Sequence, residues 1–243
     1  MPALAGVGSL SLALAMNGVD FVAVPGQLDV YAELAVETLS PAVGSRSGGT
    51  VVRVHGPGVA HSRQLTVCFV KGAWRAEVPA TFDAAAGCAS CVTPPYGGAA
   101  KEGGDDDGDC IAEISLNGQQ WTWSCKHFTY IADPEVEALD PPSGPIEGGA
   151  PLKLTGSGFR AAESLAVRFT RTELDINAAC PESLTVEGTF ADDGSVACET
   201  PVFEGADSPF DTNVQLTVDG QIFSPVTEAT VFKFEAGGGK KKK

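Results

Sequence analysis

Long apolar runs are absent from this chain of 243 residues, and so is any useful length of helical periodicity. A membrane-spanning helix needs roughly 18 or more consecutive apolar residues, so we expect no membrane insertion. Basic residues are also few, because 16 Lys and Arg stand against 31 Asp and Glu, for a formal net charge of -15. An acidic chain repels phosphate backbones, and we therefore expect no nucleic-acid binding.

Groups that could perform catalysis are scarce as well. The three histidines, His55, His61 and His127, belong to no Ser-His-Asp pattern, and the chain has no paired-carboxylate motif, P-loop or dinucleotide fingerprint. Catalysis needs convergent groups, such as a nucleophile beside a base. We therefore predict that the chain is not an enzyme and that it has no cofactor.

What the chain does contain is an internal repeat with a spacing of 100 residues. The residues that recur, each with an identical counterpart 100 positions later, are Leu39, Pro41, Gly44, Gly48, Gly49, Gly56, Gly58, Leu65, Val67 and Phe69. A Cys-x-Thr-Pro segment also occurs twice, at Cys91–Pro94 and at Cys198–Pro201. Frequent glycine and proline, 29 and 16 residues, favour many short strands joined by tight turns. We expect two copies of one β-rich domain.

A hairpin signal follows in each copy and appears a third time near the start. Alternating apolar residues lead to Asn17-Gly18, Asn117-Gly118 and Asp219-Gly220, which are typical of two-residue type I′ turns. Such turns would place Leu14 opposite Phe21, Ile114 opposite Trp121, and Leu216 opposite Phe223. In this register Trp121 and Trp123 are core residues. Residues 1–35 are then the C-terminal hairpin of a truncated preceding repeat, which must pack on something.

The glycine pattern of residues 39–59 and 139–159 resembles the opening of IPT/TIG domains, which are immunoglobulin-like. The later strand ending in Phe69 or Phe169 and the Cys-x-Thr-Pro segments are also similar to that family. The resemblance implies an all-β fold of tandem immunoglobulin-like (IPT/TIG) β-sandwich domains in a rod-like array. We place one domain at 36–132, a second at 133–236, and a Gly/Lys tail at 237–243.

The same resemblance implies a non-catalytic structural or protein-binding module, because the family occurs in receptors, transcription factors, surface proteins and large ciliary proteins. The hairpin at Asn117 is similar to one in large ciliary proteins. Our main interpretation is part of an intracellular scaffold, axonemal or microtubule-associated, within a larger chain or complex. The alternative is an extracellular receptor or adhesion ectodomain with disulfides. A third, a carbohydrate-binding appendage, would require exposed aromatics.

Two segments could bind a metal. The acidic run 105–109 has the charge for calcium but lacks the alternating spacing and the closing glutamate of a calcium loop, which favours a solvated loop. Cys88 and Cys91 have the spacing of a zinc pair, and a zinc site would need Cys110 and Cys125 as well. Cys91 instead falls at the core position of the repeated Cys-x-Thr-Pro strand. We predict no metal.

The seven cysteines bear on the compartment. Cys110 and Cys125 both lie seven steps from the Asn117-Gly118 turn, so the two-residue turn would place them opposite each other, ready for a disulfide if the chain is extracellular. Cys180 and Cys198 could pair in the second repeat. An odd number of cysteines and the absence of an Asn-x-Ser/Thr sequon favour a reducing compartment instead.

The two ends of the chain carry their own signals. Lys240, Lys241, Lys242 and Lys243 follow three glycines and could make electrostatic contact with an acidic partner, such as a tubulin tail, or could begin a linker. Residues 1–15 are apolar and small, as in a signal peptide, but no basic residue precedes them. The repeat favours a strand there.

Overall fold

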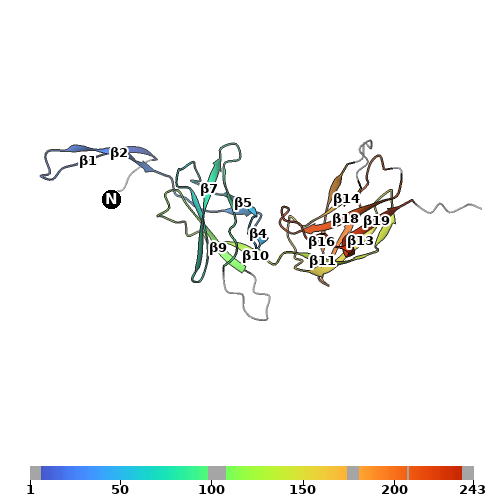
Figure 1. The fold of residues 1–243 in the computed structure, drawn as a ribbon. Helices are drawn as coiled ribbons and strands as arrows, with labels where there is room; N and C mark the ends of the chain where they lie inside the picture. The colour runs from blue at the N-terminus through green and yellow to red at the C-terminus, as the bar shows by residue number, and fades with distance from the viewer. Residues whose placement is uncertain (1–6, 98–107, 174–180, 207, 237–243) are drawn as a thin grey trace, which may run out of the picture. The chain divides into compact units, whose positions relative to one another are not determined.

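The computed structural model describes residues 7–97, 108–173, 181–206 and 208–236 (Figure 1). Strands dominate these residues, and the helical content is one short 3-10 helix, η1 (Glu228–Thr230). In the described part of the chain no helix has the length and apolar character to cross a membrane. The predicted all-β class is therefore confirmed.

The chain divides into two compact units that alternate along the sequence. Unit 1 comprises residues 1–39, 53–91 and 111–126, and unit 2 comprises residues 40–52, 92–110 and 127–243. These are not the boundaries expected from the repeat, 36–132 and 133–236, which stay a prediction.

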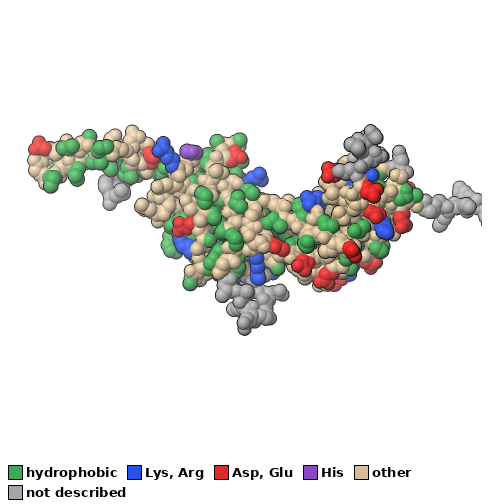
Figure 2. Space-filling view, in the orientation of Figure 1, with side chains coloured by type: hydrophobic (Ala, Val, Ile, Leu, Met, Phe, Trp, Pro, Cys, Tyr) green, Lys and Arg blue, Asp and Glu red, His purple; other side chains and the backbone are tan. Residues whose placement is uncertain are grey.

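Unit 1 contains a separate hairpin and most of a sheet. β1 (Gly8–Leu14) and β2 (Val22–Val30) pair antiparallel, and every residue of β1 is exposed (Figure 2). In the sheet, β6 (Thr66–Lys71) pairs antiparallel with β7 (Trp74–Asp83) on one side and with β9 (Gly108–Ser115) on the other. β7 also pairs with β8 (Cys88–Val92). Two further strands, β3 (Thr38–Ser40) and β5 (Val51–His55), lie partly in this unit and partly in unit 2.

Unit 2 contains a complete β-sandwich and one further strand pair. In that pair, β4 (Val43–Ser45) runs parallel to β10 (Lys126–Ile131). One sheet of the sandwich has the order β11 (Glu135–Asp140), β13 (Pro151–Ser157), β17 (Val196–Glu199) and β16 (Thr189–Phe190). The other sheet has the order β12 (Ser143–Pro145), β19 (Val231–Glu235), β18 (Phe210–Thr217), β14 (Ala166–Arg171) and β15 (Ser183–Glu187).

The core of this sandwich lies between the two sheets and follows the alternation of each strand. The first sheet supplies Leu152, Leu154 and Val196, and the second supplies Val167, Phe169, Val214, Leu216, Phe232 and Phe234; all are fully buried or nearly so. The rings of Phe169 and Phe232 meet edge to face with centroids 6.2 Å apart. The predicted immunoglobulin-like sandwich is confirmed here.

The internal repeat is reproduced in strand pairing. Val67 lies opposite Ile114 on β6 and β9, as Val167 lies opposite Leu216 on β14 and β18. The short parallel pair formed by β4 and β10 recurs as β12 and β19. Residues 100 positions apart therefore occupy equivalent places in two copies of one topology.

The repeated glycines are required for two reasons, a left-handed backbone and a close approach. Gly148 has φ +69°, and a Cβ there would lie 2.5 Å from the carbonyl oxygen of Pro201. Gly48 has φ +77°, and its Cβ would lie 2.6 Å from the carbonyl carbon of Pro94. Since an L side chain is strained at such φ values and has no room here, only glycine fits.

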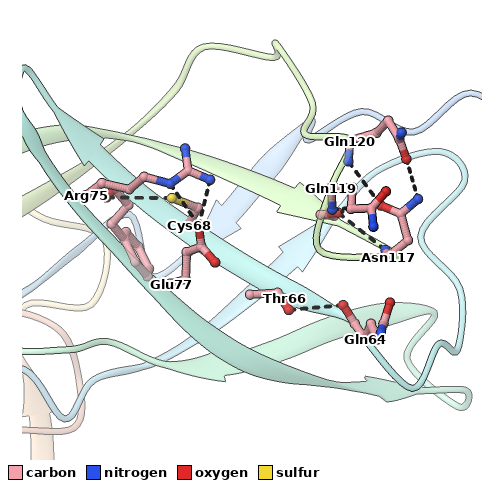
Figure 3. A network of polar contacts seen from close by, with 10 residues as sticks. Gln64, Thr66, Cys68, Arg75, Glu77, Asn117, Gln119 and Gln120 are labelled. Atoms are coloured by element: carbon pink, nitrogen blue, oxygen red, sulfur yellow. Dashed lines mark hydrogen bonds and ion pairs between the residues drawn. The ribbon is translucent and has the colours of Figure 1, made fainter.

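The predicted two-residue hairpin turns are wrong. The backbone N–H of Thr122 donates to the carbonyl of Ile114 at 3.1 Å, so Thr122 takes the place predicted for Trp121. The cause is the side chain of Asn117, whose Oδ1 accepts hydrogen bonds from the N–H groups of Gln119 (2.9 Å) and Gln120 (3.0 Å) (Figure 3). This Asx turn lengthens the loop by one residue.

The other two hairpins use the same device. Asn17 Oδ1 accepts from the N–H groups of Val19 and Asp20, and Asp219 Oδ1 accepts from those of Gln221 and Ile222. Leu14 consequently pairs with Val22, and the N–H of Ser224 donates to the carbonyl of Leu216 at 2.8 Å. Because side chains alternate along a strand, a slip of one residue moves each of them to the opposite face.

Candidate interaction surface

The slipped register moves one predicted core residue to the surface. Trp123 is 91% exposed, so its placement in the core was wrong. Trp121 is half-buried, and the guanidinium of Arg75 lies over its ring, 4.6 Å from the centroid. Arg75 also forms an ion pair with Glu77 at 2.8 Å along β7 (Figure 3). The aromatic pair therefore lies at the outside of unit 1.

The segment that carries these tryptophans is fixed by polar contacts. The hydroxyl of Thr122 donates to Glu113 Oε2 and accepts from the N–H of Ile114 at 3.0 Å. The N–H of Ser124 donates to the same Glu113 carboxylate at 3.4 Å. The hydroxyl of Ser124 accepts a hydrogen bond from the N–H of Val36 at 2.7 Å. These hydrogen bonds fix the backbone of residues 122 and 124 beside β9. Trp123, which lies between them, is therefore exposed on a segment whose backbone is held in place.

The register also removes the argument for a disulfide between Cys110 and Cys125. Cys110 is buried, and its thiol donates to the carbonyl of Phe128 at 3.2 Å. Its neighbour Asp109 has Oδ2 at 2.9 Å from Nδ1 of His127. Residues 109 and 110 thus lie beside 127 and 128, while Cys125 is exposed at φ 51°. The disulfide stays a prediction that no longer has support from strand register.

The other described cysteines are apolar core residues. Cys68, Cys88, Cys91 and Cys198 are buried. Burial raises the pKa of the Cys68 thiol to about 11 and the pKa values of Cys91 and Cys198 to about 12. Since the thiolate is the form that binds zinc or reacts, these thiols are poor ligands and poor nucleophiles.

Several residues singled out in the sequence fall where the structure gives no description. Lys240, Lys241, Lys242 and Lys243, the carboxylates of residues 105–107, and Cys180 all lie outside the described residues. The end of the acidic run enters β9, where a Cβ on Gly108 would lie 2.6 Å from that of Tyr130. Within the described ranges, no group of three or more His, Cys, Asp or Glu has the geometry of a metal site.

The three histidines lie on different parts of the first repeat. His55 ends β5, His61 lies in the loop that follows, and His127 lies on β10. The ion pair of His127 with Asp109 is exposed, with side-chain accessibilities of 62% and 47%. Asp29, His61 and Ser62 do line one hollow of unit 1, where the Ser62 hydroxyl donates to the carbonyl of Leu116.

One face of the β1–β2 hairpin exposes several large apolar side chains, and we call it the hairpin face. It carries Leu10, Leu12, Leu14 and Met16 from the first strand and its turn, with Val22 and Leu28 across from them. Leu12 is 47% exposed, Leu14 is 64% exposed and Met16 is 99% exposed. Figure 2 shows hydrophobic side chains (green) along this hairpin. Contiguous apolar surface of this kind marks interaction sites.

A hollow of about 600 Å³ within unit 1 borders the end of that hairpin. It is lined by residues 28–32, 34, 116, 117 and 119–122, including Leu28, Leu116 and Trp121. Asp29 and Tyr31 are the titratable groups of this lining, which contains no histidine, cysteine or lysine. The lining suits contact with a protein segment better than it suits chemistry.

The sequence of the chain is similar to that of known proteins. Residues 134–234 match the sequence model of the IPT/TIG domain. This part of the chain is similar to IPT/TIG domains. Plexin-B2 from Mus musculus is 27% identical over 138 residues, which cover 53% of this chain and 8% of that protein. The chain thus spans a small part of this curated relative.

Two solved structures of the plexin A4 extracellular region resemble the chain. They cover 83% and 82% of it, with TM-scores of 0.46 and 0.42 and with 15% and 16% identity. The chain corresponds to 15% and 18% of those chains. The IPT/TIG resemblance is confirmed by the match to residues 134–234, while none of these similarities supports the expected likeness to ciliary proteins.

Proposed function

We propose that the chain is a non-catalytic, protein-binding segment of the extracellular region of a plexin-like receptor or adhesion protein. The observation that carries the proposal is the 27% identity to mouse plexin-B2 over 138 residues, together with the IPT/TIG match in the second repeat. This reverses our preference for an intracellular ciliary scaffold, and axonemal partners are no longer proposed.

The arrangement of the described residues supports a role in binding rather than in chemistry. The histidines lie apart, burial raises the pKa values of the Cys68, Cys91 and Cys198 thiols, and the exposed features are apolar or aromatic. A sandwich offers edge strands and end loops to other proteins, and its packed core holds these in place. In the proposed function, the repeats bind a partner protein through these strands and loops.

The proposed domains are those that the repeat predicts. Residues 36–132 and 133–236 are two IPT/TIG-like repeats, residues 1–35 are the last hairpin of another, and residues 237–243 are a tail. The support is the recurrence of one strand pairing. The pair of β6 with β9 recurs as β14 with β18, with β14 placed 100 residues after β6 and β18 placed 102 residues after β9. Each repeat ends with a hairpin built on an Asx turn.

The location is tested by labelling intact cells of the source organism with an amine reagent that does not cross membranes. Lys153 provides an accessible amine, since its side chain is 44% exposed. We expect the protein to be labelled before lysis, while a cytosolic protein in the same sample is not. Labelling only after lysis would overturn the extracellular proposal and restore the intracellular scaffold.

A further inference from the structure

We propose that the segment 47–51, which leads from β4 into β5, is a docking surface for the hairpin turn at 219–222. We call this contact the clasp, and we infer that it keeps the β4–β10 pair and the sandwich of unit 2 moving as one body. Both segments belong to unit 2. The inference goes beyond the proposed function, and it does not depend on whether the protein is extracellular.

A buried pair of a hydroxyl and a carboxylate forms the centre of the clasp. The hydroxyl of Thr50 donates to Asp219 Oδ2 at 2.7 Å. Thr50 is fully buried and Asp219 is 5% exposed. The other carboxylate oxygen, Oδ1, already accepts hydrogen bonds within the Asx turn. Burying a carboxylate is costly unless hydrogen-bond donors satisfy it, so Thr50 supplies the donor that the turn itself does not give to Oδ2.

Gln221 adds a two-point contact with the backbone of Val51. Its side-chain Oε1 accepts from the N–H of Val51 at 2.8 Å, and its Nε2 donates to the carbonyl of the same residue at 2.9 Å. The next side chain, Ile222, lies against the same segment, because a Cβ on Gly49 would be 3.8 Å from its Cδ1. Three consecutive residues, 49–51, therefore contact the turn.

The second repeat contains the same loop with the same internal hydrogen bonds. The N–H of Thr50 donates to the hydroxyl of Thr93 at 3.1 Å. The N–H of Ala150 likewise donates to the hydroxyl of Thr200 at 3.0 Å. In return, the N–H of each of these threonines, 93 and 200, donates at 2.9 Å to the carbonyl of residue 50 or 150. The loop therefore forms without the side chain of Thr50.

The two loops differ in their ability to bind a turn. Ala150 has no hydroxyl to donate to a carboxylate, and Pro151 has no N–H to donate to a glutamine side chain. Thr50 and Val51 supply both groups in the first repeat. Since these groups are not needed to form the loop, we assign them to docking, and the docking surface is specific to the first repeat.

A second contact acts on the connection between β10 and β11. The hydroxyl of Ser47 donates to Asp133 Oδ2 at 3.0 Å. The N–H of Arg46 donates to the carbonyl of Ile131 at 2.8 Å, just before this connection. The connection is thus held at one end while the clasp holds the turn. Together the two contacts restrict rotation about residues 132–134, so that surfaces on the β4–β10 pair and on the sandwich keep a constant separation.

The test uses nuclear magnetic resonance on the full chain. The N–H of Val51 reports on the clasp directly, because it donates to Gln221. In Gln221→Ala we expect its hydrogen exchange to be faster by roughly tenfold or more than in the unmodified chain. The matched control is Gln119→Ala, which removes the equivalent glutamine of the first hairpin and should leave the exchange of Val51 unchanged.

Nitrogen-15 relaxation measures whether the parts move together. In the unmodified chain, residues of β4 and β10 should share one rotational correlation time with residues of β14 and β18. Thr50→Ala with Val51→Pro gives the loop the residues of the second repeat, where the same backbone accommodates them. In this double variant the correlation times should fall and separate.

Three results would overturn the proposal. One is exchange of Val51 that is equally fast with and without Gln221. Another is separate correlation times in the unmodified chain, and the third is a single shared time in the double variant. Circular dichroism checks that the double variant is folded; if it is not, Gln221→Ala decides through both measurements, because Gln221 is an exposed residue.

Discussion

At the scale of single residues, adjacent glycines carry different constraints. Gly148 and Gly149 both have left-handed backbones, at φ +69° and +71°. A Cβ on Gly148 would approach the carbonyl oxygen of Pro201 to 2.5 Å, but a Cβ on Gly149 would meet nothing within 4 Å. The two positions therefore separate the cost of the backbone conformation from the cost of a steric clash.

We expect Gly148→Ala to destabilise the fold more than Gly149→Ala. Both variants incur the penalty of about 1 kcal/mol for a non-glycine residue in the left-handed region. Gly148→Ala adds the clash with Pro201 and should lower the free energy of unfolding by about 1–3 kcal/mol more. Urea denaturation followed by far-ultraviolet circular dichroism measures the difference, and equal losses in the two variants would contradict the steric explanation.

At the scale of elements, the Asx turn of each hairpin decides which side chains face the core. In Asn117→Ala, the N–H groups of Gln119 and Gln120 lose their acceptor. At about 0.5–1.5 kcal/mol for each hydrogen bond, we expect the free energy of unfolding to fall by about 1–2 kcal/mol. Urea denaturation again provides the measurement.

Two variants control for other effects of that substitution. Asn117→Asp keeps the acceptor, as Asp219 does in the second repeat, and should retain most of the stability. Gln119→Ala removes an exposed side chain but leaves the turn intact, and should be nearly neutral. If Asn117→Asp were as destabilised as Asn117→Ala, the side-chain acceptor would not be what holds the turn.

The same turn marks the limit of what the sequence could predict at this scale. Strand alternation and the fold class follow from local pattern, and both are correct in the structure. Asn-Gly, however, is compatible both with a type I′ turn and with an Asx turn. The choice between them depends on hydrogen bonds from residues two and three positions later, and the wrong choice placed Trp123 in the core and Cys110 opposite Cys125.

At the scale of the whole molecule, the repeat predicted more than any motif did. Identical residues 100 positions apart occupy equivalent strands in the two repeats. Sequence alone could not show which face of the hairpin is open, because that depends on the register. Nor could it identify the compartment, since seven cysteines fit either a reducing or an oxidising one.

The oxidation state of the thiols connects the structure to the compartment. In protein purified from its source, denatured and alkylated without reduction, we expect fewer than seven alkylated cysteines, as counted by intact mass. Cys125 should be the oxidised residue because it is exposed, whereas Cys68, Cys91 and Cys198 should stay reduced because burial raises their pKa values. Peptide mapping then identifies the partner of Cys125, and a reduced sample should give all seven. If the unreduced protein also gave seven, an exposed thiol would have survived in the native compartment, which contradicts an oxidising exterior and favours a reducing interior.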